Sequence, residues 1–94
     1  MDTPGPPAEE LLRRARAGDA DARGRLLEAY RGYLTLLARV QLGRDLRAKV
    51  DPSDLVQEAF MEAHRDFGQF QGQTEAELLA WLRRVLARIA HRGL

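Results

Sequence analysis

Apolar residues recur along most of the chain at intervals of three and four positions, which is the period of an α-helix. This pattern predicts helices over about residues 8–17, 20–42, 52–67 and 75–91. β-branched residues are scarce, whereas Leu, Ala and Arg, which favour helices, dominate the composition. Because short connections join these segments, we predict an all-α fold, a compact bundle of about four helices.

The inward faces of these helices give the expected core. In the first two helices it comprises Leu11, Leu12, Ala15, Leu26, Leu27, Tyr30, Leu34, Leu37 and Val40, with Tyr33 and Leu36 widening the stripe. In the last two it comprises Leu55, Val56, Ala59, Phe60, Ala63, Phe67, Leu78, Leu82, Val85, Leu86 and Ile89. Each set repeats with the helical period, so each helix has one face to bury.

The ends of the predicted helices carry suitable capping residues. Asp51 fits an N-cap, because its carboxylate can accept from the free N–H groups of the first turn, and Pro52 fits the next position. Thr74 and Glu77 form a capping box at the start of the last helix. Gly18 fits the position that follows the first helix.

Two stretches outside the helices lack a regular pattern. Residues 1–7 are rich in Pro and Gly and are expected to be disordered, which leaves residues 8–94 as the folded domain. Residues 44–50 are expected to form a loop anchored by Leu46 and Val50. The cations of this loop are either solvated or in contact with phosphate.

Composition narrows the class of protein. A length of 94 residues corresponds to one domain, and the lack of cysteine excludes disulfides and thiolate metal sites. The apolar runs are too short to cross a bilayer and the N-terminus is unlike a signal peptide, so we expect a cytoplasmic protein without a membrane partner. His64 and His91 match no metal-ligand pattern, and no phosphate-binding loop or nucleophile motif occurs. We therefore expect neither an enzyme nor a metal or cofactor.

The polar residues define two different surfaces, although the net charge is only +1. The outer face of the 52–67 helix is mostly acidic with one methionine, and comprises Asp54, Gln57, Glu58, Met61, Glu62 and Arg65. The 75–91 helix instead carries a basic stripe of Arg84, Arg88 and Arg92, with Arg83 beside it and Trp81 at its border. Solvation alone would explain either face, but the asymmetry suggests two partners, and a tryptophan beside the basic stripe favours DNA.

A loop over residues 68–73 joins the last two helices. It contains two glycines, three amides and a phenylalanine, Phe70. Flexible backbone, amide groups and a stacking ring are the ingredients for holding an unstacked base. The loop could equally be a simple connection whose Phe70 packs into the core. The residues alone leave both interpretations open.

The order of these motifs resembles a known family. Residues 54–60, DLVQEAF, resemble the core-polymerase-binding helix (region 2.2) of bacterial sigma factors, most closely of the extracytoplasmic-function (ECF) class. Phe67, Phe70 and Gly72, followed by WLRRV at residues 81–85, are similar to regions 2.3 and 2.4. The resemblance extends over roughly residues 11–89 and identifies the chain as similar to a region 2 domain.

The resemblance implies a transcription-initiation domain without enzymatic activity. Region 2 docks on the coiled coil of the β′ subunit of core RNA polymerase, opens the −10 promoter element and captures a flipped base of the non-template strand. Here Asp54, Gln57 and Glu58 would contact the coiled coil. Met61 and Leu55 would add apolar contact or support.

The same resemblance implies a set of DNA contacts. The loop residues Gln69, Phe70, Gln71, Gly72 and Gln73 would hold the flipped base. Trp81 would lie near the upstream edge of the melted segment. The residues that would reach phosphates or base edges are Arg83, Arg84 and Arg88.

The sequence departs from the family in two respects. Family members often carry an asparagine seven residues after the tryptophan, where this chain has Arg88. The sequence ends at Leu94 without a second helical domain, so we expect nothing in it to bind the −35 element. An excised domain, a truncated factor and a stand-alone protein would all look like this.

These departures leave two other functions open. The chain could be a protein-interaction module that binds polymerase or an anti-sigma factor without recognising DNA. It could also be a helical bundle that resembles the family by chance. Polymerase binding separates the family from the bundle, and a preference among single-stranded DNAs separates the sigma factor from the module.

Overall fold

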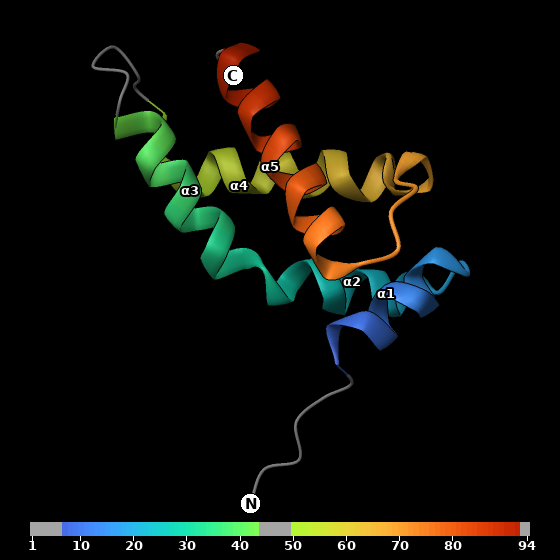
Figure 1. The fold of residues 1–94 in the computed structure, drawn as a ribbon. Helices are drawn as coiled ribbons and strands as arrows, with labels where there is room; N and C mark the ends of the chain where they lie inside the picture. Colours follow the sequence, from blue (N-terminus) through green and yellow to red (C-terminus); the bar gives the residue numbers. More distant parts are fainter. Residues whose placement is uncertain (1–6, 44–49, 93–94) are drawn as a thin grey trace, which may run out of the picture.

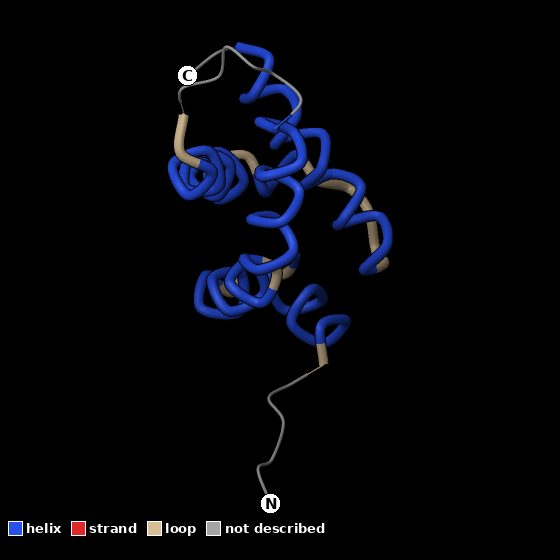
Figure 2. The backbone as a smooth tube through the Cα atoms, turned by 90° about the vertical axis from the view of Figure 1, so that its left-hand side faces the viewer, coloured by secondary structure: helices blue, strands red, loops and turns tan. Residues whose placement is uncertain are grey.

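The computed structural model describes residues 7–43 and 50–92 of the chain. In chain order the elements are α1 (Ala8–Arg16), α2 (Ala20–Ala29), α3 (Arg31–Gly43), α4 (Pro52–Arg65), the 3-10 helix η1 (Phe67–Gln69) and α5 (Glu75–Arg92) (Figure 1). Across this described part of the chain only helices and loops occur, which confirms the all-α prediction (Figure 2). The expected disordered lead and the expected loop at residues 44–50 lie, apart from Pro7 and Val50, outside the described residues.

The helices form two groups. The first group is the α1–α2 pair, whose members pack mainly against each other. The second group consists of α3, α4 and α5, each of which packs against the other two, with α5 crossing α4 (Figure 1). The two groups share one hydrophobic core, which both holds the bundle together and fixes the surfaces of α4 and α5.

The predicted helix over residues 20–42 is wrong, because α2 and α3 are separate helices that meet at Tyr30. The Tyr30 backbone, with φ −101° and ψ 6°, leaves the helical region. Its carbonyl accepts the Leu34 N–H at 2.9 Å and so starts α3. The bend lets α2 pack on α1 while α3 packs on α4 and α5, which one straight rod could not do. The described residues therefore contain five α-helices rather than about four.

The predicted helix ends are mostly confirmed. Asp51 caps α4 by accepting the Ser53 N–H at 2.8 Å, and hydrogen bonds from the Ser53 hydroxyl and N–H lower the pKa of Asp51. Thr74 Oγ1 accepts the Glu77 N–H at 3.1 Å, as the capping box predicts. Gly18 has φ 103°, a left-handed conformation that suits glycine after a helix. Apart from shifts of one residue, one of these helix ends differs: α4 ends at Arg65, before the predicted residue 67.

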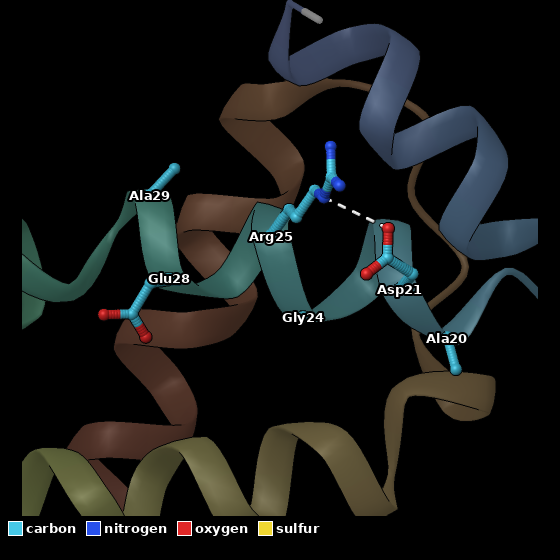
Figure 3. Close-up of a pocket in the computed structure, with 6 residues that line it drawn as sticks. All are labelled: Ala20, Asp21, Gly24, Arg25, Glu28 and Ala29. Atoms are coloured by element: carbon cyan, nitrogen blue, oxygen red, sulfur yellow. Dashed lines mark ion pairs between the residues drawn. The ribbon is translucent and has the colours of Figure 1, made fainter. Parts of the chain in front are cut away.

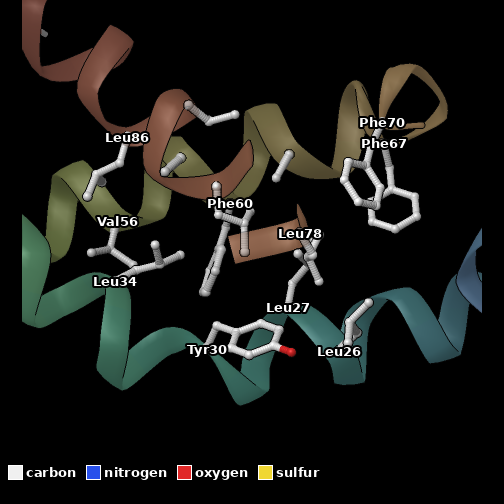
Figure 4. Packing of buried hydrophobic residues seen from close by; sticks show 14 of the residues in the cluster. Leu26, Leu27, Tyr30, Leu34, Val56, Phe60, Phe67, Phe70, Leu78 and Leu86 are labelled. Carbon is white, nitrogen blue, oxygen red and sulfur yellow. The ribbon is translucent and has the colours of Figure 1, made fainter. Parts of the chain in front are cut away.

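The core contains most of the predicted residues. Tyr30 between α2 and α3, Phe60 on α4, and Phe67 and Phe70 at η1 all point into it (Figure 4). Two predicted members of the core stripe are wrong, since Leu36 and Val40 on α3 are 59% and 47% exposed. The bend at Tyr30 resets the helix phase, so α3 buries the pair that lies four residues apart at Leu34 and Ala38 instead.

Candidate functional site

The outer face of α4 is open to solvent. Asp54, Gln57, Glu58 and Met61 are exposed along it, and Met61 is 57% exposed. Leu55 differs, because it is completely buried and reaches no partner directly. Of the two roles that the resemblance implies for Leu55, contact and support, its burial favours support of the helix.

The exposed apolar residues on α3 were missed by the sequence prediction. Leu36 and Val40 lie one helical turn apart and were assigned to the core. Together with Met61 they are the large hydrophobic side chains that the described residues leave exposed. No local signal marks them, since only the bend between α2 and α3 decides which face of α3 is buried.

Glu62 corrects the predicted outer face of α4. Only 6% of this residue is exposed, because α5 crosses over it. Its carboxylate accepts hydrogen bonds from Arg88 and, at 3.0 Å, from Arg92 Nη2. Arg65 Nη2 lies 3.8 Å from the same carboxylate. A single anion is thus paired with cations from two helices, and it joins α4 to α5.

The basic stripe on α5 is therefore partly committed to contacts within the domain. Arg88 pairs with Glu62, although 54% of its side chain remains exposed. Arg83 Nη1 donates to the Tyr33 hydroxyl at 2.9 Å and so ties α5 to α3. Arg84 is exposed and lines the hollow described below. The arginines that the sequence places on one surface therefore lie in three different environments: beside Tyr33, beside Glu62 and in the lining of the hollow.

Phe67, Phe70 and Trp81 form an aromatic cluster where η1 and the following loop meet α5. Ring centroids lie 5.9 Å apart for Phe67 and Phe70 and 5.4 Å apart for Phe70 and Trp81. Phe67 meets Trp81 edge to face at 6.0 Å. Phe70 is only 6% exposed, so it packs into the core as one of the two open interpretations predicted. In this conformation the Phe70 ring lines one side of the site, and its face is too buried to stack on a base.

A hollow of about 440 Å³ opens beside this cluster. Its lining comprises Gln69, Phe70, Gln71, Gly72, Glu77, Ala80, Trp81 and Arg84. The structure thus brings together most of the residues predicted to contact DNA, while Gln73, Arg83 and Arg88 lie outside this lining. Amide groups, an aromatic wall and one cation suit a flat heterocycle attached to a phosphate.

Gly72 lets the loop close over Phe70. A Cβ at this position would lie 2.5 Å from Phe70 Cζ and 2.8 Å from Glu77 Cβ, closer than side chains pack. Hydrogen bonds from the Gln73 N–H and the Thr74 hydroxyl lower the pKa of Glu77. The Glu77 carboxylate therefore stays ionised at the edge of the hollow near neutral pH.

A second hollow lies on the other side of the loop. It measures about 390 Å³ and is lined by Glu9, Leu12, Arg13, Arg16 and Gln73. Gln73, predicted to hold a base, thus lines this hollow and not the one beside Trp81. Arg16 donates a hydrogen bond to the Gly72 carbonyl between the two hollows. The sequence suggested no such role for Arg16, because the two residues are 56 positions apart.

A larger depression on α2 contains none of the predicted site residues (Figure 3). It measures about 680 Å³ and is open to solvent. Its lining is small residues, Glu28 and an ion pair in which Arg25 Nε lies 3.0 Å from Asp21. Both partners of the pair are largely exposed, so we assign no site to this surface.

Two features are absent from the described residues. No group of histidine and acidic side chains among them could hold a metal ion. None of the helices described here has both the length and the apolar character that a membrane span requires.

Comparison with known proteins gave one match. Residues 26–94 match the family model for sigma-70 region 2. No curated protein and no solved structure matches the chain. The matched range includes every residue predicted to contact polymerase or DNA, whereas α1 lies before it.

Proposed function

The chain belongs to the sigma-70 region 2 family, and we propose that it binds the β′ coiled coil of core RNA polymerase and captures the non-template strand of the −10 element. The family acts in transcription initiation, where it binds RNA polymerase and promoter DNA. It is a transcription-factor family rather than an enzyme family. The observation that carries the finer proposal is the hollow beside Trp81, together with the open face of α4.

The α4 face is suited to a basic helical partner. Asp54 and Glu58 supply negative charge, and Gln57 supplies an amide between them. Charges at the rim of an interface accelerate encounter and fix orientation, while an exposed methionine such as Met61 packs adaptably. We therefore assign polymerase binding to these four residues, with Leu55 supporting the helix beneath them.

The hollow is suited to an unstacked base. Gln69 and Gln71 can hydrogen-bond the edge of a base, and Trp81 supplies an aromatic surface. Arg84 lies in the same lining and can meet the adjacent phosphate. Contacts of this kind offset the few kcal/mol that unstacking a base requires, in order-of-magnitude terms.

We assign the domain to the ECF class from the DLVQEAF helix and the W-L-R-R motif. A factor of this class works in the cytoplasm, where polymerase and promoter DNA meet. With this assignment, an anti-sigma factor becomes a third proposed partner, beside polymerase and promoter DNA.

Calorimetry with the isolated β′ coiled coil tests the polymerase assignment. We expect the wild type to bind and the Gln57→Ala/Glu58→Ala variant to lose at least about tenfold in affinity, as for the loss of a charged contact at an interface. Asp21→Ala is the matched control, because it also removes one exposed carboxylate, on α2. A folded wild type that does not bind, or a double variant that binds normally, would overturn the assignment.

A polymerase-binding module without DNA recognition is the second candidate. The observation that favours it is the pairing of Arg88 with Glu62, which diverts a predicted DNA contact into the domain. This candidate predicts equal affinity for short single-stranded DNAs of different sequence at fixed salt. A clear sequence preference would exclude it.

A further inference from the structure

We infer that Arg16 of α1 is a positioning residue of the nucleic-acid site, because it holds the loop over residues 69–73 against the aromatic cluster. The nucleic-acid part of this inference rests on the proposed function. The family match begins at residue 26 and assigns no role to α1.

The Arg16 side chain reaches two parts of the loop. Its Nη1 donates to the Gly72 carbonyl, and its guanidinium carbon lies 6.0 Å from the centroid of the Phe70 ring. Glu77 is near enough for the charge of Arg16 to contribute to the lowered pKa of its carboxyl group. Arg16 thus contacts the Gly72 carbonyl and lies near the Phe70 ring, and its charge acts on Glu77 from a greater distance.

The loop depends on side chains for its position. No backbone–backbone hydrogen bond joins Gln71, Gly72 or Gln73 to another described residue. Two side-chain contacts replace such bonds: the Glu77 carboxylate accepts the Gln73 N–H at 3.3 Å, and Arg16 donates to the Gly72 carbonyl. Removal of the Arg16 side chain would leave the contact between Gln73 and Glu77 as the remaining one of these two.

The neighbouring arginines on α1 behave differently. Arg14 Nε donates to Glu10 at 3.0 Å and Arg13 Nε donates to the same carboxylate at 3.1 Å. Both pairs lie within α1, as surface pairs three or four residues apart usually do. Arg16 instead crosses to the loop and stands between the two hollows. Arg14 is therefore a control with the same charge on the same helix.

Two measurements on Arg16→Ala, Arg16→Lys and Arg14→Ala test the inference. Acrylamide quenching of the only tryptophan, Trp81, reports on the loop without any ligand, because Phe70 packs on it. We expect acrylamide to quench Trp81 more strongly in Arg16→Ala than in the wild type. Quenching in Arg16→Lys should be intermediate, and quenching in Arg14→Ala should equal that of the wild type. Circular dichroism checks that the helices remain.

The second measurement is affinity for a short fluorescein-labelled single-stranded DNA at low and high salt. We expect Arg16→Ala to bind about fivefold more weakly than Arg14→Ala, the effect of about one hydrogen bond. The difference should persist at high salt, whereas a simple charge effect would be screened. Arg16→Lys should recover part of the loss.

The outcomes separate the two proposals. Equal quenching and equal affinity in the Arg16 and Arg14 variants would overturn the inference and leave the proposed function intact. Increased quenching without a difference in affinity would overturn the role in DNA binding. If the wild type binds no single-stranded DNA, the proposed DNA function fails, and the quenching comparison alone supports or overturns the role of Arg16 in holding the loop.

Discussion

Arg88 on α5 donates a hydrogen bond to the Glu62 carboxylate on α4, and this contact joins the helices that carry the two proposed interfaces. Glu62 is almost fully buried, whereas about half of the Arg88 side chain is exposed. The pair is therefore open to solvent on one side. A ligand phosphate competing for Arg88 would have to replace a partner that the fold already supplies.

Glu62→Gln should destabilise the domain and strengthen non-specific DNA binding. The substitution removes the anion that Arg88 and Arg92 share, so we expect a loss of about 1–3 kcal/mol in the free energy of unfolding. The released arginines should steepen the salt dependence of DNA binding. Urea denaturation and salt-dependent binding titrations measure the two effects.

A double-mutant cycle with Arg88→Ala isolates the pair. Glu58→Gln is the matched control, because it makes the same chemical change on the exposed face of α4. We expect a coupling energy for Glu62 and Arg88 well above that for Glu58 and Arg88. Equal coupling energies would contradict an energetic role for the contact.

Gly72→Ala should disturb the hollow and the core together. The added methyl group would overlap the Phe70 ring and Glu77, so we expect a loss of about 1–3 kcal/mol in the free energy of unfolding. Gly68→Ala is the control, because a Cβ there meets nothing within 4 Å. Thermal unfolding of both variants makes the comparison. Equal stability in the two would show that the loop moves aside freely.

Gly24→Ala and Gly32→Ala should each stabilise the domain. Both positions are helical and a Cβ at either meets nothing within 4 Å, so alanine adds helix propensity without a clash. The gain should be up to about 1 kcal/mol each. Gly18→Ala should have the opposite sign, because its φ of 103° strains any other residue. Chemical denaturation of the three variants measures their free energies of unfolding and so tests this order of stability. A loss of stability in Gly24→Ala would contradict the open space around this position.

Acidification should weaken the domain through His64. Burial and the charge of Arg23, whose Nε lies 3.2 Å from His64 Nδ1, lower the pKa of this imidazole below its ordinary value of 6.5. The unfolded chain then binds a proton more readily than the folded one. The contribution of His64 is therefore complete above pH 6.5 and is lost as the pH falls towards the folded pKa.

Denaturation curves measured across this pH range test the expectation. His64→Gln should lose less stability than the wild type on acidification, since it has no imidazole to protonate. Parallel curves for the wild type and His64→Gln would argue against the assignment.

Local features of the sequence predicted local features of the structure. The N-cap at Asp51 and the capping box at Thr74 each depend on residues two or three positions apart, and both are confirmed. Gly18 also adopts the expected left-handed conformation. The helical period also predicted most of the core, because the repeat of apolar residues within one helix is enough to show which face of that helix is buried.

Contacts between distant residues could not be predicted in this way. The break at Tyr30 follows from two helices having different packing partners. The burial of Glu62 depends on where α5 crosses α4, and the contact between Arg16 and Gly72 depends on where α1 meets the loop. Glu62 and Arg16 are residue types that are ordinary for a helix surface, and only the tertiary arrangement gives them a special environment.

The short connection after α4 has a consequence for how the two interfaces would work together. Asp66 alone separates the end of α4 from η1, and Phe67 is already buried in the core. The start of the loop that lines the hollow is therefore held close to the C-terminal end of α4. If polymerase holds α4 as proposed, the polymerase itself would set the effective concentration of the hollow near a melted strand. A domain that binds free single strands weakly would then capture the same strand more efficiently within the complex.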